Sequence, residues 1–304
     1  MEIDVRSEKE EALKKALAKK ADPESRRMLR FLAMPDLSRT PGSPIYELVQ
    51  RITNLKSFAD FDIIRVPEIV PEDVSFDLFN FPSDHPARSK SDTYYIDSQN
   101  VLRTHTTVMW YYWLNQPEVK KKIEKGESTG ALSFGKVYRK DEIDRHHMNV
   151  FHQMDGWYLC RKEKRIITSE DLQNILVEIA KAVFGENVKY RFNEDQFPYT
   201  DPSLEMEAEI NGQWIEMLGS GMARKSVLQN FGLTGYHGWA FGFGLERLAI
   251  ASMSLPDIRL LWSEDPRVTK QLKLGQKYQE VSKYPSIVRD ISFVVSDNFV
   301  PNNY

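Results

Sequence analysis

The sequence contains very little cysteine and no long hydrophobic run. Cys160 is the single cysteine among 304 residues, so an internal disulfide is excluded and a cysteine-based zinc site is not expected. No apolar run approaches the length that a membrane-spanning helix needs. We therefore expect no zinc and no membrane partner.

The sequence also lacks a strong charge of one sign. Its formal net charge is −3, so contact with nucleic acid would need local basic patches rather than a general positive field. One lysine-rich run, residues 117–125, is either a solvated helix face or a contact for an RNA backbone. Hydrophobic residues make up 41% and charged residues 28%, which is typical of a soluble globular protein with one large or two ordinary domains.

The first residues of the chain are acidic. Glu2, Asp4, Glu8, Glu10 and Glu11 all lie at the N-terminus. A secretory signal begins with a basic segment, and transit peptides contain few acids. The composition therefore argues against a targeting segment and predicts a cytoplasmic protein.

The segment 238–250 combines a short apolar strand with the start of a helix at Leu245. Gly242 and Gly244 indicate a close approach of the backbone to another group. Arg247 stands in the first helical turn, where the helix dipole opposes a cation, so an anionic ligand would explain its position. A glycine-rich turn with a solvated arginine is the alternative. A dinucleotide-binding fingerprint is disfavoured because its third glycine and its βαβ unit are missing.

Residues 204–219 have the pattern of a β-hairpin. Apolar residues alternate with glutamates, and Asn211-Gly212 is a strong signal for a two-residue turn. Counting back from this turn places Glu207 opposite Glu216. Two carboxylates in this arrangement repel each other unless a cation lies between them. Mg²⁺ is commonly held by a few carboxylates together with substrate phosphates, so the pair indicates Mg²⁺ with ATP. A solvated face on which the repulsion is tolerated is the alternative.

Other patterns predict the remaining elements. Helices are expected over residues 7–20, from Pro23 to Met34, from Pro44 to Leu55, and from the capping box at Thr168–Asp171 to Gly185. Strands are expected over 61–66 and 188–192, and a hairpin over 137–156 with a charged loop at 144–149. Residues 35–44 are predicted to be a linker and 71–92 a loop. The chain thus divides into an N-terminal helical appendage (1–34), a central domain (35–275) and a C-terminal segment (276–304).

The segment 238–250 resembles the third signature motif of the class II aminoacyl-tRNA synthetases, and in particular that of the phenylalanyl-tRNA synthetases. Four other segments resemble parts of this family in the same order: 44–67 (first motif), 102–107 (Leu-Arg-Thr-His-Thr-Thr), 137–156 (second motif) and 196–200 (Gln-Phe-Pro-Tyr-Thr). The resemblance covers roughly residues 36–295 and is nearest to the single-chain, organellar type of catalytic, α-type chain. It implies an α+β fold in which helices flank an antiparallel sheet.

The resemblance implies a set of residues for ATP: Arg139, Asp141, His147, Phe151, Glu207, Glu216 and Arg247. Arg139 and Arg247 are expected to be catalytic, because a guanidinium stays charged and donates two parallel hydrogen bonds to phosphate oxygens. Phe151 would stack on adenine, and Glu207 and Glu216 would hold Mg²⁺.

The resemblance also implies a set of residues for phenylalanine: His105, Thr107, Gln153, Asp155, Phe197, Tyr199, Ala240 and Gly242. The first four would surround the ammonium group, the two aromatic residues would cradle the ring, and the two small residues would leave room for it. Thr107, Asp155 and Tyr199 replace the Ser, Glu and Phe that are usual in the family. Trp110 stands where several relatives have Gln.

The activity implied by the resemblance is activation of L-phenylalanine with ATP to phenylalanyl-adenylate, followed by transfer to tRNA(Phe). The expected partners are ATP, L-phenylalanine and tRNA(Phe), with a β-type subunit or a second copy of the chain left open. Residues 276–304 resemble the start of a ferredoxin-like anticodon-binding domain, which would be incomplete. Two alternatives remain: a paralogue that activates an amino acid without charging tRNA, and a non-catalytic paralogue that binds RNA or a protein. The sequence indicates no role for residues 1–34.

Overall fold

The centre of the fold is an eight-stranded sheet in the computed structural model, which describes residues 1–282, 289, 290, 292 and 294. In spatial order the strands are β1 (Glu2–Asp4), β2 (Asp62–Arg65), β5 (Thr129–Tyr138), β6 (Val150–Arg161), β10 (Tyr236–Gly244), β9 (Gln213–Ala223), β8 (Thr200–Ile210) and β7 (Tyr190–Asp195). The pairs β1–β2 and β2–β5 are parallel and all the others are antiparallel. A second small sheet contains β3 (Ile69–Pro71) and β4 (Asn100–Leu102).

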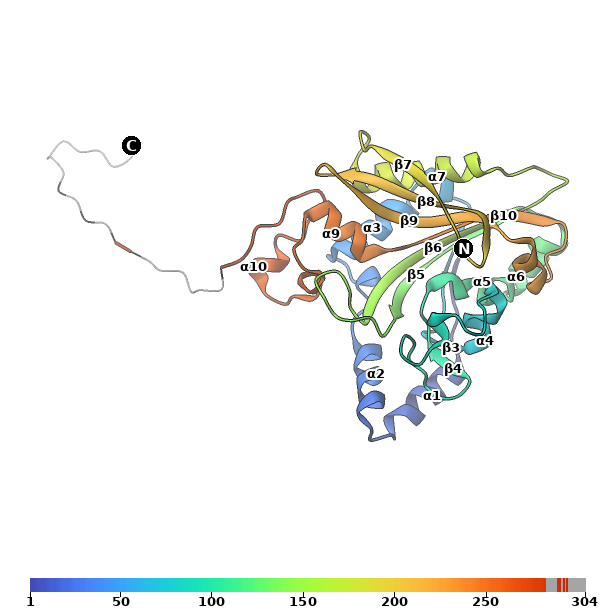
Figure 1. Cartoon of the computed structure of the whole chain (residues 1–304), viewed down its shortest axis with the longest axis horizontal. Coiled ribbons are helices and arrows are strands. Elements are labelled where there is room, and N and C mark those ends of the chain that lie inside the picture. Colours follow the sequence, from blue (N-terminus) through green and yellow to red (C-terminus); the bar gives the residue numbers. More distant parts are fainter. Residues whose placement is uncertain (283–288, 291, 293, 295–304) are drawn as a thin grey trace.

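Helices connect and cover these strands (Figure 1). The α-helices are α1 (Glu8–Ala18), α2 (Pro23–Ala33), α3 (Pro44–Thr53), α4 (Glu72–Ser75), α5 (Met109–Leu114), α6 (Pro117–Glu124), α7 (Ser169–Phe184), α8 (Lys225–Asn230), α9 (Leu245–Met253) and α10 (Pro266–Thr269). Short 3-10 helices lie at Leu37–Arg39, Lys56–Phe58, Asp77–Phe79, Pro86–Arg88, Thr106–Val108 and Ile258–Trp262. Within the described residues, no helix combines the length and the apolar character needed to cross a membrane.

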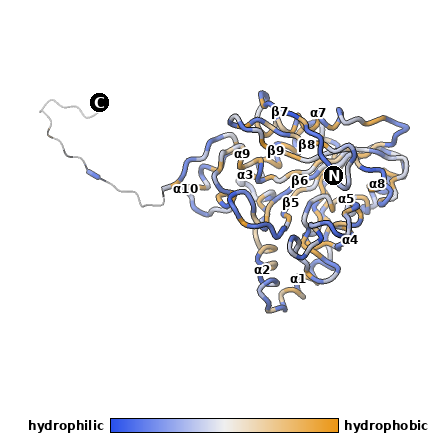
Figure 2. Tube along the Cα trace, viewed as in Figure 1, coloured by the Kyte–Doolittle hydropathy of each residue, from blue (hydrophilic) through white to orange (hydrophobic). Residues whose placement is uncertain are grey.

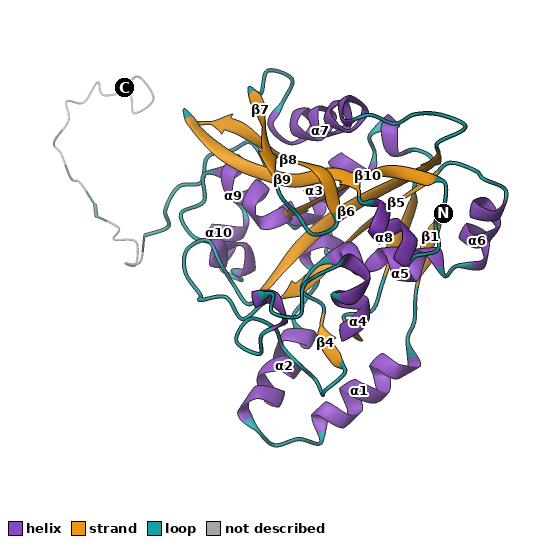
Figure 3. Ribbon diagram, turned by 45° about the vertical axis from the view of Figure 1, so that its right-hand side comes forward, coloured by secondary structure: helices purple, strands orange, loops and turns teal. Residues whose placement is uncertain are grey.

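The two faces of the sheet are covered by different helices (Figure 3). Successive side chains of a strand point to opposite faces. On β10, Trp239, Phe241 and Phe243 accordingly pack in one core cluster with α3, α7 and α9, whereas Ala240 belongs to a second cluster with α5 and α8. Figure 2 shows that the outer loops are mainly hydrophilic, while hydrophobic segments run through the sheet and the helices against it.

Most predicted elements are confirmed. The structure has an α+β fold with a mainly antiparallel sheet, and the helices expected near residues 7–20, 23–34 and 44–55 are α1, α2 and α3. Helix α7 begins with the predicted capping box of Thr168 and Asp171 and ends at Gly185. The hairpin register around Asn211-Gly212 is also as predicted.

Some expectations differ from the structure. The first strand of the charged hairpin ends at Tyr138 rather than extending to residue 144, so the loop is longer than expected. Segment 71–92 contains α4 and two 3-10 helices, and β1 was not expected at all. Segment 35–44 is not an extended linker, because Leu37 and Ser38 are buried. The ferredoxin-like start predicted at 276–304 lies largely outside the described residues.

Candidate active site

A cavity of about 1230 Å³ lies against β6, β9 and β10 on the face opposite α3 and α7. Its lining contains every residue that the sequence predicted for ATP and phenylalanine except Glu207. These residues come from segments as far apart as residues 105 and 247. The sheet therefore brings the predicted site together at one place.

Asp155 is a deeply buried acid of the cavity. It is only 4% exposed, and burial raises the pKa of its carboxyl to about 6, against the opposing effect of the hydrogen bond from Thr107. The Thr107 hydroxyl donates to Asp155 Oδ2 at 2.5 Å. Thr107 thus orients the carboxylate that was predicted to meet the ammonium group.

Two further acceptors in the cavity have no protein partner. His105 Nε2 lies 2.9 Å from the Ser75 carbonyl oxygen; since a carbonyl can only accept, Nε2 carries the proton and Nδ1 is an acceptor. Burial lowers the pKa of His105 to about 4, so the ring is neutral at physiological pH. Among the described residues neither His105 Nδ1 nor Gln153 Oε1 has a hydrogen-bond partner. With Asp155 they form a set of acceptors whose chemistry suits an ammonium group.

Aromatic rings form the wall beside these acceptors. The Phe197 and Tyr199 rings lie parallel, with centroids 5.8 Å apart and planes at 11°. Space for Phe197 depends on Gly219, because a Cβ there would lie 2.6 Å from the phenyl ring. Ala240 and Gly242 also line the cavity, as predicted. At Gly242 a Cβ would lie 2.5 Å from Asp155 Oδ1, so only glycine leaves that carboxylate in place.

Arg139 lies between this pocket and the outer part of the cavity. Its Nε donates to the Thr104 carbonyl at 3.0 Å, and its guanidinium carbon is 5.2 Å from the centroid of Phe151. Burial lowers the pKa of Arg139, while the charge of Asp141 opposes that shift. Among the described residues its terminal nitrogens have no hydrogen-bond or ion-pair partner. They are therefore available for an anionic ligand.

The charged loop after Arg139 is organised by Asp144. Its Oδ1 accepts from the backbone N–H groups of His146 and His147 at 2.6 and 2.7 Å, and its carboxylate lies 3.0 Å from His147 Nδ1. His147 and Asp141 both line the cavity. The two histidines do not share a metal position there, and no cluster of three or more potential metal ligands occurs among the described residues.

The β8–β9 hairpin has Glu207 directly opposite Glu216. Glu207 Oε2 accepts from Arg191 Nε and from Asn193 Nδ2, and these bonds, Arg191 first, lower the pKa of the Glu207 carboxyl. Glu216 pairs with Arg247 Nη1 at 2.6 Å. Each carboxylate is thus accompanied by an arginine on the cavity side of the sheet.

The carboxylates on this hairpin suit a divalent cation. A third carboxylate, Glu205, shares the face: burial first, and then the charges of Glu216 and Glu207, raise its pKa. Arg191 and Arg247 balance Glu207 and Glu216 in this structure, and a bound cation would do the same for carboxylates that share one face. Mg²⁺ accepts carboxylate oxygens and completes its coordination with phosphates and water. Glu207 and Glu216 therefore fit the predicted ion.

Several residues of the site were not predicted. The Phe81 ring lies parallel to His105, with centroids 5.9 Å apart and planes at 5°, but it comes from a loop without periodicity. Glu205 was not predicted as a site residue, because Gly219 rather than an acid stands opposite it on β9. Trp214, at the cavity rim, has the Arg191 guanidinium 4.4 Å from its ring centroid. No local pattern in the sequence indicates these contacts.

Comparison with known proteins agrees with this geometry. Residues 32–272 match the family of tRNA synthetases class II core domain (F). The pyrrolysyl-tRNA synthetase from Desulfitobacterium hafniense has a similar fold, with a TM-score of 0.56, 18% identity and 78% of each chain covered. This likeness supports the α+β class II fold.

Named relatives are phenylalanine–tRNA ligases. The chloroplastic/mitochondrial protein of Arabidopsis thaliana is 41% identical over 247 residues, which are 78% of this chain and 55% of the relative. The mitochondrial protein of Mus musculus is 33% identical, with 79% of this chain and 59% of the relative covered. The alpha subunit of Clostridium acetobutylicum is 33% identical, with 88% and 81% covered. The chain thus spans little more than half the length of the first two relatives. It belongs to the class II tRNA synthetase core-domain family, among the homologues of phenylalanine–tRNA ligase.

Proposed function

We propose that the chain activates L-phenylalanine with ATP to form phenylalanyl-adenylate and then transfers the phenylalanyl group to tRNA(Phe). The observation that carries the proposal is the set of unpartnered acceptors, His105 Nδ1 and Gln153 Oε1, beside Asp155 at the end of an aromatic pocket. An ammonium group with an apolar ring matches this arrangement. Arg139 and Arg247, further out, suit the phosphates of ATP.

In the first step a carboxylate oxygen of phenylalanine attacks the α-phosphorus, and the bond from that phosphorus to the pyrophosphate oxygen breaks. Arg139 would hold the α-phosphate and the substrate carboxylate together, which places the reacting atoms next to each other. Its charge would also stabilise the negative charge that develops on the phosphoryl oxygens. Phe151 would stack on the adenine ring, and Asp141 and His147 would contact the nucleotide. In the second step a hydroxyl of the tRNA attacks the acyl carbon and AMP leaves.

Glu207 and Glu216 would hold Mg²⁺, which supplies positive charge to the phosphates when it is bound. Arg247 pairs with Glu216 in this structure, and we propose that its guanidinium contacts phosphate when ATP is present. A cation bound to Glu216 would release that arginine.

The proposed function also assigns a role to each of the predicted segments of the chain. Residues 35–275 would be the catalytic unit, 1–34 an appendage, and 276–304 the start of an anticodon-binding domain. Because relatives include an alpha subunit, a β-type subunit or a second copy of this chain remains a proposed partner. The cytoplasmic location expected from the acidic first residues stays a prediction, since relatives are named chloroplastic or mitochondrial as well.

ATP–pyrophosphate exchange across the standard amino acids tests the first step. We expect exchange with phenylalanine, and a loss of about 100-fold or more in Arg139→Ala, because a charged donor to the reacting phosphate is removed. The matched control is Arg267→Ala. Arg267 is paired with Asp265 on α10 and lies outside the cavity, so its removal should leave exchange unchanged.

The outcomes separate the alternatives. Normal exchange by Arg139→Ala would contradict the mechanism. Exchange with phenylalanine but no charging of tRNA(Phe), even with a β-type subunit added, would favour a paralogue with another acceptor. Absence of both exchange and ligand binding would favour a non-catalytic paralogue.

A further inference from the structure

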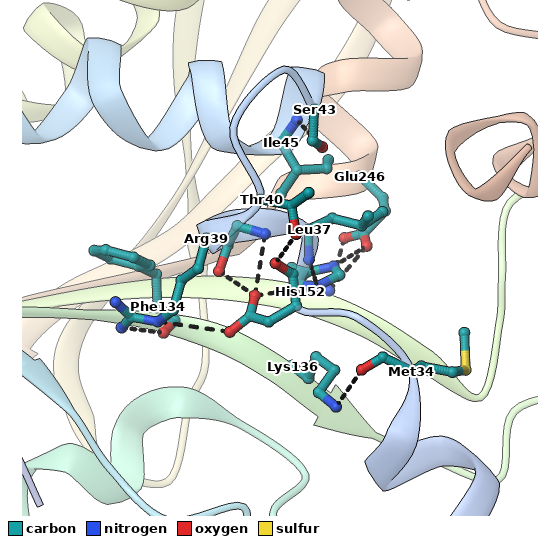
Figure 4. Close-up of polar contacts among 12 residues, drawn as sticks. Met34, Leu37, Arg39, Thr40, Ser43, Ile45, Phe134, Lys136, His152 and Glu246 are labelled. Atoms are coloured by element: carbon teal, nitrogen blue, oxygen red, sulfur yellow. Dashed lines mark hydrogen bonds and ion pairs between the residues drawn. The ribbon is translucent and has the colours of Figure 1, made fainter. Parts of the chain in front are cut away.

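Glu246, which no prediction assigned to the site, is a buried carboxylate at the start of α9. It is 3% exposed and is directed toward β6 (Figure 4). Its oxygens accept from the backbone N–H of His152 at 2.8 and 3.0 Å, and Oε1 lies 2.6 Å from His152 Nδ1. The ladder between β10 and β6 ends at Gly244 opposite Gln153. Glu246 thus accepts the N–H of the next residue along β6, where β10 has already turned into α9.

His152 is held at its other end as well. The Leu37 backbone N–H donates to His152 Nε2 at 2.9 Å. A backbone N–H can only donate, so Nε2 has the lone pair and Nδ1 carries the proton that goes to Glu246. The ring is fully buried and lies against Trp262, with centroids 5.5 Å apart and planes at 28°. Asp36 Oδ1 lies 3.4 Å from the same Nε2. The imidazole is therefore held in one orientation by contacts at both of its nitrogens.

Glu246 lines the cavity, whereas its partner His152 does not. Neighbours in a strand point to opposite faces, so Phe151 and Gln153 project into the cavity while His152 projects away from it. On α9 the residue after Glu246 is Arg247, about 100° further around the helix axis. Arg247 lines the cavity and reaches Glu216. The contact between Glu246 and His152 therefore connects α9 to β6. Each of these elements also carries a residue that is proposed to contact ATP, Arg247 on α9 and Phe151 on β6.

A purely structural role would be served as well by an apolar residue. Burial of a carboxylate is costly unless it is fully hydrogen-bonded, and apolar substitutes of similar volume often give equal stability. Apolar packing tolerates small rotations of a helix, whereas directed hydrogen bonds do not. The polar pair therefore fixes the rotation of α9 about its axis more narrowly than a hydrophobic contact would.

We propose that Glu246 and His152 are positioning residues. They hold Arg247 of α9 and Phe151 of β6 in a fixed relative position, so that ATP binds in a single orientation. The inference rests on the proposed function and extends it to two buried residues that are not proposed to contact ATP. The Leu37 N–H supports the same contact, because it donates to His152 Nε2 and leaves Nδ1 to face Glu246. Residues 36–37 are thereby linked to the ATP site without touching ATP.

ATP affinity, measured by titration calorimetry without amino acid, tests this inference. At a temperature where all variants are folded, Glu246→Ala and His152→Ala should each bind ATP about tenfold more weakly, a loss equal to about 1.4 kcal/mol. Phenylalanine affinity should change by less than about threefold, since His105 and Asp155 are positioned separately. The double variant should bind ATP no more weakly than the single variant with the lower ATP affinity, because the two residues act as one unit. Glu246→Gln should recover part of the affinity, since its amide oxygen still accepts the His152 backbone N–H.

Thr168→Ala is the matched control. It removes the capping box of α7, which contributes no residue to the cavity, so it should lower the unfolding temperature and leave ATP affinity unchanged. If Glu246→Ala fails to fold, Glu246→Gln decides the question by the same measurement. ATP affinity within about twofold of the parent, together with a lowered unfolding temperature, would show a purely structural role and overturn the inference.

Failure of this inference can be distinguished from failure of the proposed function. A parent chain that binds ATP but does not exchange with phenylalanine would contradict that function, while the ratio of ATP affinities would still decide the role of Glu246. A parent chain that does not bind ATP would contradict both.

Discussion

Asp155 carries its negative charge only above the pH at which its buried carboxyl loses a proton, about 6. The substrate ammonium stays protonated across this range, so binding needs the carboxylate form. We expect the KM for phenylalanine to rise as the pH falls from 8 through 6, while the KM for ATP changes little. His105, with its pKa lowered to about 4 by burial, stays neutral over this range and does not contribute. Exchange kinetics at a series of pH values measure this, and a flat KM for phenylalanine between pH 5 and 8 would rule it out.

Gly242 provides a second test at the residue scale. A methyl group at this position would meet Asp155 Oδ1, whereas at Gly244 it would have nothing within 4 Å. We expect Gly242→Ala to raise the KM for phenylalanine by about tenfold or more, because displacing the carboxylate weakens a charge-assisted contact. Gly244→Ala is the control and should leave that KM unchanged. Equal values for the two variants would show that the position of Asp155 does not limit binding.

The sequence predicts some of these residues better than others. Phe151, Gln153 and Asp155 share one face of β6, which follows from alternation along a strand. The contact of Thr107 with Asp155 joins segments 48 residues apart, so no local pattern indicates it. Phe81 and Glu246 depend in the same way on tertiary placement. Their roles become visible only when the partner atoms are located.

Among the elements, the β8–β9 hairpin leads to a prediction about the metal. Glu207, Glu209 and Glu216 all lie on this hairpin, but Glu209 stands opposite Trp214 and pairs with Lys189. We expect Glu207→Gln and Glu216→Gln each to raise, by about tenfold, the Mg²⁺ concentration that gives half-maximal exchange, since each removes a carboxylate ligand. Glu209→Gln should leave the Mg²⁺ titration unchanged. A shift of equal size in all three variants would indicate only a general effect of charge.

Elements were predicted best where their signals are local. A turn dipeptide and alternating residues define β8 and β9, and cap residues define α7. Strand β1 contains only Glu2, Ile3 and Asp4, which is too short for a period to be seen. Its place beside β2 depends on pairing between residues about 60 positions apart. Strand β5 begins earlier than expected because its whole length is buried, so it lacks the alternation of a half-exposed strand.

For the whole molecule, Lys136 connects the N-terminal helices to the sheet. Its ammonium group donates to the carbonyl oxygens of Leu32 and Met34 at the end of α2 and lies 3.3 Å from Glu68. Lys136→Met would leave these acceptors without a donor, so we expect a loss of about 2–4 kcal/mol in the free energy of unfolding.

Urea denaturation measures that loss, and Lys189→Met provides the control. Lys189 forms an exposed pair with Glu209, and its removal should cost less than about 1 kcal/mol. Equal stability of Lys136→Met and the parent would show that the contacts of Lys136 do not stabilise the packing of α2 on the sheet.

The order of strands in the sheet has a consequence for synthesis on the ribosome. Among the described residues β10 is the last strand along the chain, yet it lies between β6 and β9. The β5–β6 and β8–β9 hairpins can form as soon as they emerge, but each keeps an unpaired edge until residues 236–244 leave the exit tunnel. Unpaired edges recruit other strands, so a nascent chain of this protein is most prone to aggregate during that interval. We therefore expect a chain that is cut short before residue 244 to be insoluble.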